Sequence, residues 1–71
     1  MTTVIESTIK NKYYVSLSIE TRYNREIYNI QACPCYDDNR CGYPEQEMTY
    51  PIEEKKKAYA TYRRYVKKYC A

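Results

Sequence analysis

The 71 residues of this chain make one small domain, and a chain of that length removes only about 60% of its surface from water on folding, so its core is thin. It contains 11 tyrosines but no Phe, Trp or His, and its net charge of +3 is too small to identify a partner. With no His, one Gly and no cluster of Ser with an acid and a base, the sequence excludes imidazole-based catalysis and Gly-rich phosphate loops, and we expect no enzyme activity.

The strict alternation of residues 13–20 predicts a half-buried strand. The apolar side of this strand consists of Tyr13, Val15, Leu17 and Ile19, and the other side consists of Tyr14, Ser16, Ser18 and Glu20. A Tyr ring supplies as much apolar area as Phe when its hydroxyl reaches water or a partner. We therefore expect a core of Tyr and Ile with phenol groups at its margin.

Weaker strands precede and follow this one. Residues 3–10 place Ile5 and Ile9 on one face, and the Asn and Lys that come next fit a two-residue hairpin turn, although they lack the usual Gly. After a polar turn, alternation resumes in residues 26–32. The first part of the chain is therefore predicted to be a β-meander.

Residues 33–47 are rich in residues that interrupt regular structure. They contain two prolines, the only Gly and three of the four cysteines, so we expect an irregular Cys-rich loop. Residues 48–50 then fit a short edge strand.

The pattern of residues 51–70 predicts an amphipathic helix. Pro51 fits the first helical position, where its missing N–H costs nothing, and glutamates in the first turn and lysines in the last complement the helix dipole. The core-facing stripe consists of Ile52, Ala58, Tyr59, Tyr62, Tyr65, Val66 and Tyr69. The opposite, basic face carries Lys56, Lys57, Arg63, Arg64, Lys67 and Lys68.

Together these elements predict an α+β fold, in which a three- or four-stranded antiparallel β-sheet, a meander, packs on one C-terminal α-helix. The single domain (1–71) consists of the β-meander (1–32), the Cys-rich loop (33–47), the short strand (48–50) and the helix (51–70). The other face of the sheet is expected to stay open to solvent. An exposed edge strand could also pair with the same strand of a second copy, so a homodimer is a further alternative.

The four cysteines have three alternative interpretations. They are Cys33, Cys35, Cys41 and Cys70. We favour reduced, partly buried thiols, because the Cys-x-x-Cys spacing that usually marks a zinc site is absent. A structural zinc site made by all four thiolates stays open, as do disulfides in any of three pairings. We expect no other cofactor.

The basic helix face indicates nucleic acid as an alternative partner. Residues 51–71 carry seven basic and two acidic residues, whereas residues 1–50 carry five basic and seven acidic ones. The six cations of the basic face lie along about 20 Å of helix, a spacing that can follow a phosphate backbone, with tyrosines nearby to stack on bases. Lys-rich outer helix faces are also common in proteins that bind no nucleic acid, so this function is the alternative and not the first choice.

Four tyrosines have no place in the predicted core. One lies on the outer sheet face and three lie in turns or loops, where exposed Tyr beside Arg has the composition of protein-binding hot spots. The predicted partner-binding residues are Tyr14, Tyr23, Tyr36, Arg40 and Tyr43.

We therefore expect a small non-enzymatic binding protein whose partner is a larger host protein or protein complex. Lys, Asn, Ile and Tyr are abundant, as in many AT-rich phage genomes, which favours an accessory protein of a phage or mobile element that inhibits or modulates a host defence or nucleic-acid-handling protein. The N-terminus lacks the features of a secretory signal, and no apolar run approaches the roughly 20 residues of a membrane span. The expected location is the host-cell cytoplasm, with no membrane partner.

Overall fold

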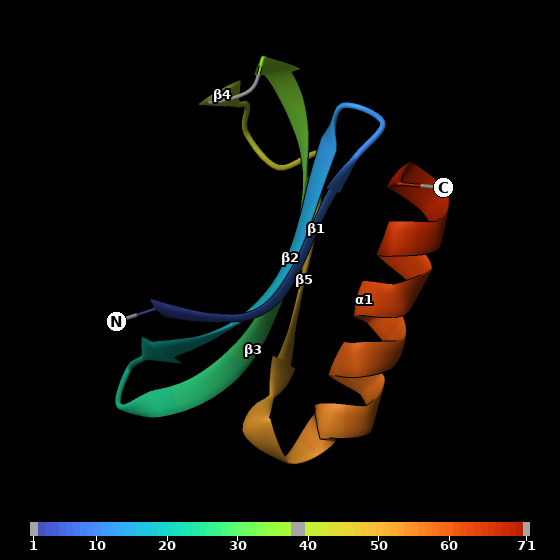
Figure 1. Ribbon diagram of the computed structural model, residues 1–71. Coiled ribbons are helices and arrows are strands. Elements are labelled where there is room, and N and C mark those ends of the chain that lie inside the picture. The colour runs from blue at the N-terminus through green and yellow to red at the C-terminus, as the bar shows by residue number, and fades with distance from the viewer. Residues whose placement is uncertain (1, 38–39, 71) are drawn as a thin grey trace.

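The computed structural model describes residues 2–37 and 40–70 as one antiparallel sheet and one C-terminal helix (Figure 1). The elements are β1 (Thr2–Lys10), β2 (Tyr13–Arg22), β3 (Arg25–Asp37), β4 (Arg40–Cys41), β5 (Gln46–Pro51), the 3₁₀ turn η1 (Ile52–Glu54) and α1 (Lys55–Tyr69). The predicted α+β fold, an antiparallel meander packed on one C-terminal helix, is confirmed. No helix in the described ranges is long and apolar enough to cross a membrane.

The main sheet has the order β1-β2-β3-β5, and every pairing in it is antiparallel. The short β4 pairs with the far end of β3, beyond the part that β5 covers. Two-residue turns join β1 to β2 at Asn11 and Lys12, and β2 to β3 at Tyr23 and Asn24. All four turn residues have φ between 52° and 66°, as in the type I′ turns that match the twist of paired strands. The predicted first hairpin is confirmed.

A bulge changes the faces of β1. Its pairing with β2 shifts between Val4 and Glu6, so Ile5 falls within the irregularity. Beyond the bulge, Thr8 faces the helix, and Ile9 lies on the opposite sheet face with 69% of its surface exposed. The simple alternation predicted for this strand is wrong, because one inserted residue moves every later side chain to the other face.

The irregular loop predicted over residues 33–47 is wrong in its first part, because β3 continues through Pro34. The Cys35 N–H donates to the Lys12 C=O at 2.7 Å, which keeps this end of β3 attached to the first hairpin. At Pro34 the backbone N and C=O face away from β2, and the C=O accepts from the Gly42 N–H, so the missing N–H costs no hydrogen bond to β2. β5 also begins earlier than predicted, at Gln46.

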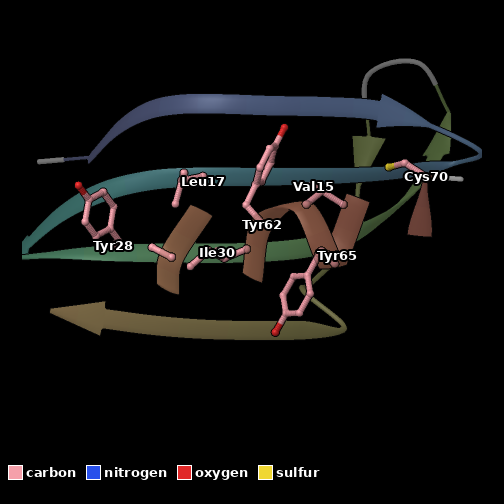
Figure 2. Close-up of a cluster of buried hydrophobic side chains, with 9 residues drawn as sticks. Val15, Leu17, Tyr28, Ile30, Tyr62, Tyr65 and Cys70 are labelled. Carbon is pink, nitrogen blue, oxygen red and sulfur yellow. The ribbon is translucent and has the colours of Figure 1, made fainter. Parts of the chain in front are cut away.

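The core lies between α1 and the sheet. It consists of Val15, Leu17, Tyr28, Ile30, Ala32, Ala58, Tyr62, Tyr65 and Cys70. Figure 2 shows Tyr62 pointing from α1 toward β1 and Tyr65 pointing toward β5, so rings fill the space on both sides of the helix. The Tyr62 hydroxyl lies 2.8 Å from Thr8 Oγ1, and the Tyr50 hydroxyl lies 2.7 Å from Thr61 Oγ1. These contacts confirm the prediction of tyrosine rings in the core with phenol groups at its margin.

The C-terminal helix follows the prediction except at its start. The prediction that Pro51 takes the first helical position is wrong, because Pro51 is still paired with Ile27 of β3 and ends β5. The 3₁₀ turn η1 comes next, and α1 ends at Tyr69. Every residue of the predicted core-facing stripe is either buried or packed half-buried against the core. Thr61 is buried as well, although a polar residue was not expected there.

Candidate functional site

The sheet face away from α1, here called the open face, has no described element over it, yet its centre is buried. Ser16 and Ser18 on β2 are each 6% exposed, and Asn29 on β3 is 1% exposed. Figure 1 shows the β2–β3 hairpin and β4 both bending away from α1, which makes the open face concave. This curvature and the longer side chains of the neighbouring strands shield the small polar residues from water.

A chain of hydrogen bonds crosses the open face from β2 to β5. The side-chain amide of Asn29 donates to Glu20 Oε1 at 2.8 Å and to Glu47 Oε2 at 3.4 Å. The Gln31 amide donates to the same Glu47 oxygen, and Arg22 pairs with Glu20 Oε2 at 2.8 Å. Two carboxylates on the strands flanking β3 are thereby held in fixed positions.

This hydrogen-bond chain has more acceptors than donors. Within the described ranges, no donor lies within hydrogen-bonding distance of the buried Asn29 Oδ1 atom. Glu47 is exposed, and its donors in the same part of the chain are two neutral amides. An unpaired buried polar group costs about 1–3 kcal/mol, and carboxylates bind most strongly to charged donors. Asn29 Oδ1 is too deeply buried for a partner to reach, so the exposed Glu47 carboxylate is the group here that suits a charged donor such as an Arg or Lys side chain.

The predicted partner-binding residues fall into two groups at opposite ends of the sheet. Tyr36 and Tyr43 flank β4 and are 76% and 94% exposed, and Tyr14 lies half-buried on the open face at the same end. The backbone of Arg40 belongs to β4, but its side chain lies outside the described part of the structure. Tyr23 is 97% exposed in the β2–β3 turn at the other end. The structure therefore does not join all five residues in one patch.

The β4 end of the sheet is closely packed. A Cβ atom added to Gly42 would lie 2.8 Å from Tyr36 Cε2, so the Tyr36 ring rests against the glycine. Shallow hollows lie on both sides of Cys41, one reaching Tyr36 and the other reaching Tyr43. Tyr36 and Tyr43 therefore each border a shallow hollow at this end of the sheet.

The structure does not bring the four cysteines together. Cys35 and Cys41 lie opposite each other on β3 and β4, with their Sγ atoms 2.8 Å apart, and Cys33 is buried nearby on β3. Cys70 lies on the helix side of the sheet, where its Sγ is 3.7 Å from the Tyr13 backbone oxygen (Figure 2). The four-thiolate zinc site does not fit this arrangement, and the described residues hold no group of three Cys, Asp or Glu placed to bind a metal ion.

Cys33, Cys35 and Cys70 are weak nucleophiles in the reduced protein. Burial raises the pKa of Cys33 and of Cys70. The hydrogen bond with Cys41, with a further contribution from burial, raises the pKa of Cys35 to about 11. A raised pKa leaves little thiolate at neutral pH, and the chain has no His to act as a base.

The basic face of α1 points away from the sheet. Its 15 residues include seven basic residues and no acidic one. The predicted basic residues, Lys56, Lys57, Arg63, Arg64, Lys67 and Lys68, are all exposed. Lys57 Nζ lies 3.4 Å from Glu54, and Lys55 Nζ lies 5.8 Å from the centroid of the Tyr59 ring. With Lys56 and Arg63, Lys55 and Tyr59 line a shallow hollow on the helix surface.

Sequence reasoning missed the centre of the open face. Asn29 stands between Tyr28 and Ile30 in an alternating strand, so it was expected to face solvent like any polar residue on an open side. Its burial depends on Glu20 and Glu47, which pairing across β2, β3 and β5 brings beside it. A polar residue at the middle of the predicted central strand is a weak signal for such a site.

No protein family, curated protein or solved structure matches this chain. What the protein does is therefore inferred from its own side chains. Two surfaces on opposite sides of the sheet are candidates, namely the open face with its tyrosines and the basic face of α1.

Proposed function

We propose that this protein is a non-enzymatic binding module that holds a larger protein against its open face. The observation that carries the proposal is the hydrogen-bond chain through Asn29, which is covered by no described element and ends on the exposed Glu47 carboxylate. A surface whose side chains are already fixed loses little conformational freedom on binding. Such a surface supports tight association by a small domain.

Tyr23 supports a role in binding. Its φ of 52° is a left-handed conformation that Asn or Gly adopts more readily than Tyr. Its side chain is 97% exposed, so packing within the domain offsets little of that cost. A Tyr that neither packs nor suits its turn is well placed to give contact area to a partner.

The size and chemistry of the open face limit the kind of partner. The two longer dimensions of the molecule are 35 and 22 Å. A face of that size has room for the about 800 Å² that each partner buries in a standard interface. The exposed Glu47 carboxylate, whose donors among the described residues are two neutral amides, favours a partner with exposed Arg and Lys, as on the nucleic-acid-binding surface of a host enzyme. An AT-rich phage or mobile element and the host-cell cytoplasm remain the proposed setting, on composition alone.

The test removes contacts at each end of the open face without disturbing the core. Tagged protein is purified from a bacterial host, its bound protein is identified, and affinity is then measured with that purified partner. Tyr23→Asn and Tyr43→Ser, at opposite ends, are each expected to weaken binding by about 30-fold, the effect of losing one hot-spot residue. Because Asn suits the turn better than Tyr, Tyr23→Asn should fold at least as stably as the original chain.

Arg64→Ala is the matched control, because Arg64 is exposed on the basic face and lies away from the proposed interface. It is expected to bind the partner normally. The proposal is wrong if the two tyrosine variants bind as tightly as the original chain, or if native mass spectrometry finds a homodimer and no other partner.

A second function, nucleic-acid binding by α1, is favoured by the seven basic and no acidic residues of that helix. Binding to a duplex oligonucleotide should then weaken with salt, with a logarithmic slope of about −0.9 for each phosphate contacted. Arg63→Ala and Lys67→Ala should weaken binding equally on all sequences, whereas Tyr43→Ser should leave it unchanged. Absent or salt-independent binding would exclude this function.

A further inference from the structure

The geometry of the β3–β4 pair places two thiols in position to form a bond. Cys35 and Cys41 are directly opposite each other, and the Gly42 N–H donates to the Pro34 C=O at 2.7 Å. This bond joins the residues next to the two cysteines, so Cys35 and Cys41 do not bond to each other through their backbones. At such non-hydrogen-bonded positions the opposed Cα atoms are about 4.5 Å apart and the side chains are closest. Disulfides form between Cα atoms about 4.4–6.8 Å apart, so this position accepts one without moving the backbone.

The two thiols are also accessible, unlike the others. Cys41 is exposed and Cys35 is half-buried, whereas Cys33 is 7% exposed and Cys70 is 2% exposed. Cys70 lies on the opposite side of the sheet, next to the Tyr13 backbone oxygen. An oxidant in solution therefore meets Cys41 first, and the nearest partner sulfur is Cys35 Sγ at 2.8 Å.

We propose that Cys35 and Cys41 are a reversible redox pair that a low-molecular-weight disulfide, such as oxidised glutathione, converts into a disulfide joining β3 to β4. The sequence allows three pairings of the four cysteines, and the structure selects this pair. The disulfide itself does not depend on the proposed binding function. Its effect on partner binding does, because Tyr36 and Tyr43 flank the pair.

The reaction proceeds by two thiol–disulfide exchanges. The Cys41 thiol loses its proton to solvent, and the thiolate attacks one sulfur of oxidised glutathione, which releases one glutathione thiolate and leaves a mixed disulfide. Cys35 then loses its proton and attacks Cys41 Sγ, which releases the second glutathione thiolate. The two cysteines lose two electrons and two protons in total, and the glutathione disulfide gains the two electrons and becomes two thiols after protonation.

The order of these steps follows from the state of Cys35. Its hydrogen bond with Cys41 raises the pKa of Cys35 to about 11, so little of it is thiolate at neutral pH. Once Cys41 has formed the mixed disulfide, it no longer carries a thiol to bond with Cys35. The opposed strands then hold Cys35 beside the sulfur that it must attack, which favours ring closure over loss of the adduct.

The structural consequence is local. Cys35 and Cys41 are six positions apart, so the disulfide closes a short loop and restricts the unfolded chain less than a long cross-link would. It fixes β4 against β3 beside Gly42, the residue on which the Tyr36 ring rests. Oxidation should therefore hold Tyr36 and Tyr43 in place at this end of the sheet.

The test uses the full reduced chain incubated with oxidised glutathione, followed by alkylation of the remaining thiols and mass spectrometry. The expected product has lost the mass of two hydrogen atoms, keeps two alkylatable thiols, and carries no glutathione. Trypsin cleaves after Arg40, which lies between the two cysteines in sequence, so the disulfide should join two tryptic peptides. A stable glutathione adduct on the original chain, or four alkylatable thiols, would overturn the proposal.

Matched serine variants identify the pair. Cys33→Ser and Cys70→Ser should form the same disulfide, whereas Cys35→Ser should lose rapid ring closure and accumulate one glutathione on Cys41. If Cys33→Ser accumulates the adduct instead, the pair is Cys33 and Cys41 and the proposal is wrong. Oxidation in urea, where the strands no longer oppose the thiols, should give a mixture of pairings. A single Cys35–Cys41 product in urea would show that the fold does not select the pair.

Discussion

The two faces of β2 are similarly hidden from water but chemically opposite. On the helix side Val15 and Leu17 have no exposed surface, and on the open face Ser16 and Ser18 are 6% exposed. The helix side is covered by the apolar stripe of α1, whereas the open face is shielded by the curvature of the sheet and by polar side chains bonded to one another. Burial stabilises the fold on the first side, and on the second it fixes the positions of hydrogen-bonding groups. Equal burial therefore does not imply an equal contribution to stability.

The largest expected effect comes from placing a charge at the centre of the open face. Asn29→Asp replaces the amide that donates to Glu20 and Glu47 with a third carboxylate at a site that is 1% exposed. An uncompensated buried charge should lower the free energy of unfolding by about 4 kcal/mol at neutral pH, as measured by urea unfolding. Acidification should recover part of this loss, because it protonates the introduced carboxyl group.

Asn24→Asp is the control for this prediction. It makes the same chemical change at an exposed turn residue, so the free energy of unfolding should change by less than about 0.5 kcal/mol. A small loss of unfolding free energy for both variants would mean that water reaches the centre of the open face. The two faces of β2 would then not be equally buried.

The next effect compares neighbouring residues on the two faces. Leu17→Ala removes a side chain with no exposed surface from the apolar core and should lower the free energy of unfolding by about 3 kcal/mol. Ser16→Ala, one residue earlier on the open face, should cost less than about 1 kcal/mol. If the Leu17 variant is already unfolded, Ile30→Val makes a smaller cavity and should lower the free energy of unfolding by about 1 kcal/mol. Equal losses at positions 16 and 17 would contradict the distinction between the faces.

The smallest effect concerns alkaline pH and compares one thiol from each face. Burial raises the pKa of Cys70 on the helix side and of Cys33 on the open face above the ordinary value of 9.0. The folded chain then holds these protons more tightly than the unfolded chain, so this contribution to stability is complete below pH 9.0 and is lost as pH rises through the raised values.

Urea unfolding under reducing conditions, at neutral pH and about one unit above pH 9.0, measures this effect. Cys70→Ala and Cys33→Ser should each lose less stability between the two pH values than the original chain does. A loss that neither substitution reduces would assign the alkaline sensitivity to other groups, of which Tyr65 is one, because burial also raises its pKa.

Much of the fold could be predicted because its local patterns agree with its packing. Residues 13–20 alternate without a break, and the apolar side of this strand is the side that α1 covers. Register shifts are harder to predict: the bulge near Ile5 depends on pairing with β2 and leaves no local signature. The end of β3 was predicted too early for a different reason: a proline ends a strand only where its missing N–H is needed for pairing, and at Pro34 pairing with β2 does not need it.

The candidate site was less predictable because its parts come from separate strands. Exposure of Tyr23, Tyr36 and Tyr43 follows from their places in turns and at strand ends, and the predicted meander already implies that Tyr23, in its second turn, lies at the far end of the sheet from the other two. Asn29 and Glu47 are joined across β3 and β5 only after β5 pairs with β3. Interactions of this kind depend on tertiary arrangement and have no local sequence pattern.

The position of α1 has an electrical consequence for the whole molecule. Seven basic residues of the helix lie on one side of the sheet, and the carboxylates of Glu20 and Glu47 lie on the other, across a molecule whose shortest dimension is 17 Å. This separation gives the domain a permanent dipole directed across the sheet. In the field of a charged macromolecule the domain would rotate before contact, presenting the helix to an anionic surface and the open face to a cationic one. The charge of the partner would thus select which side of the domain meets it first.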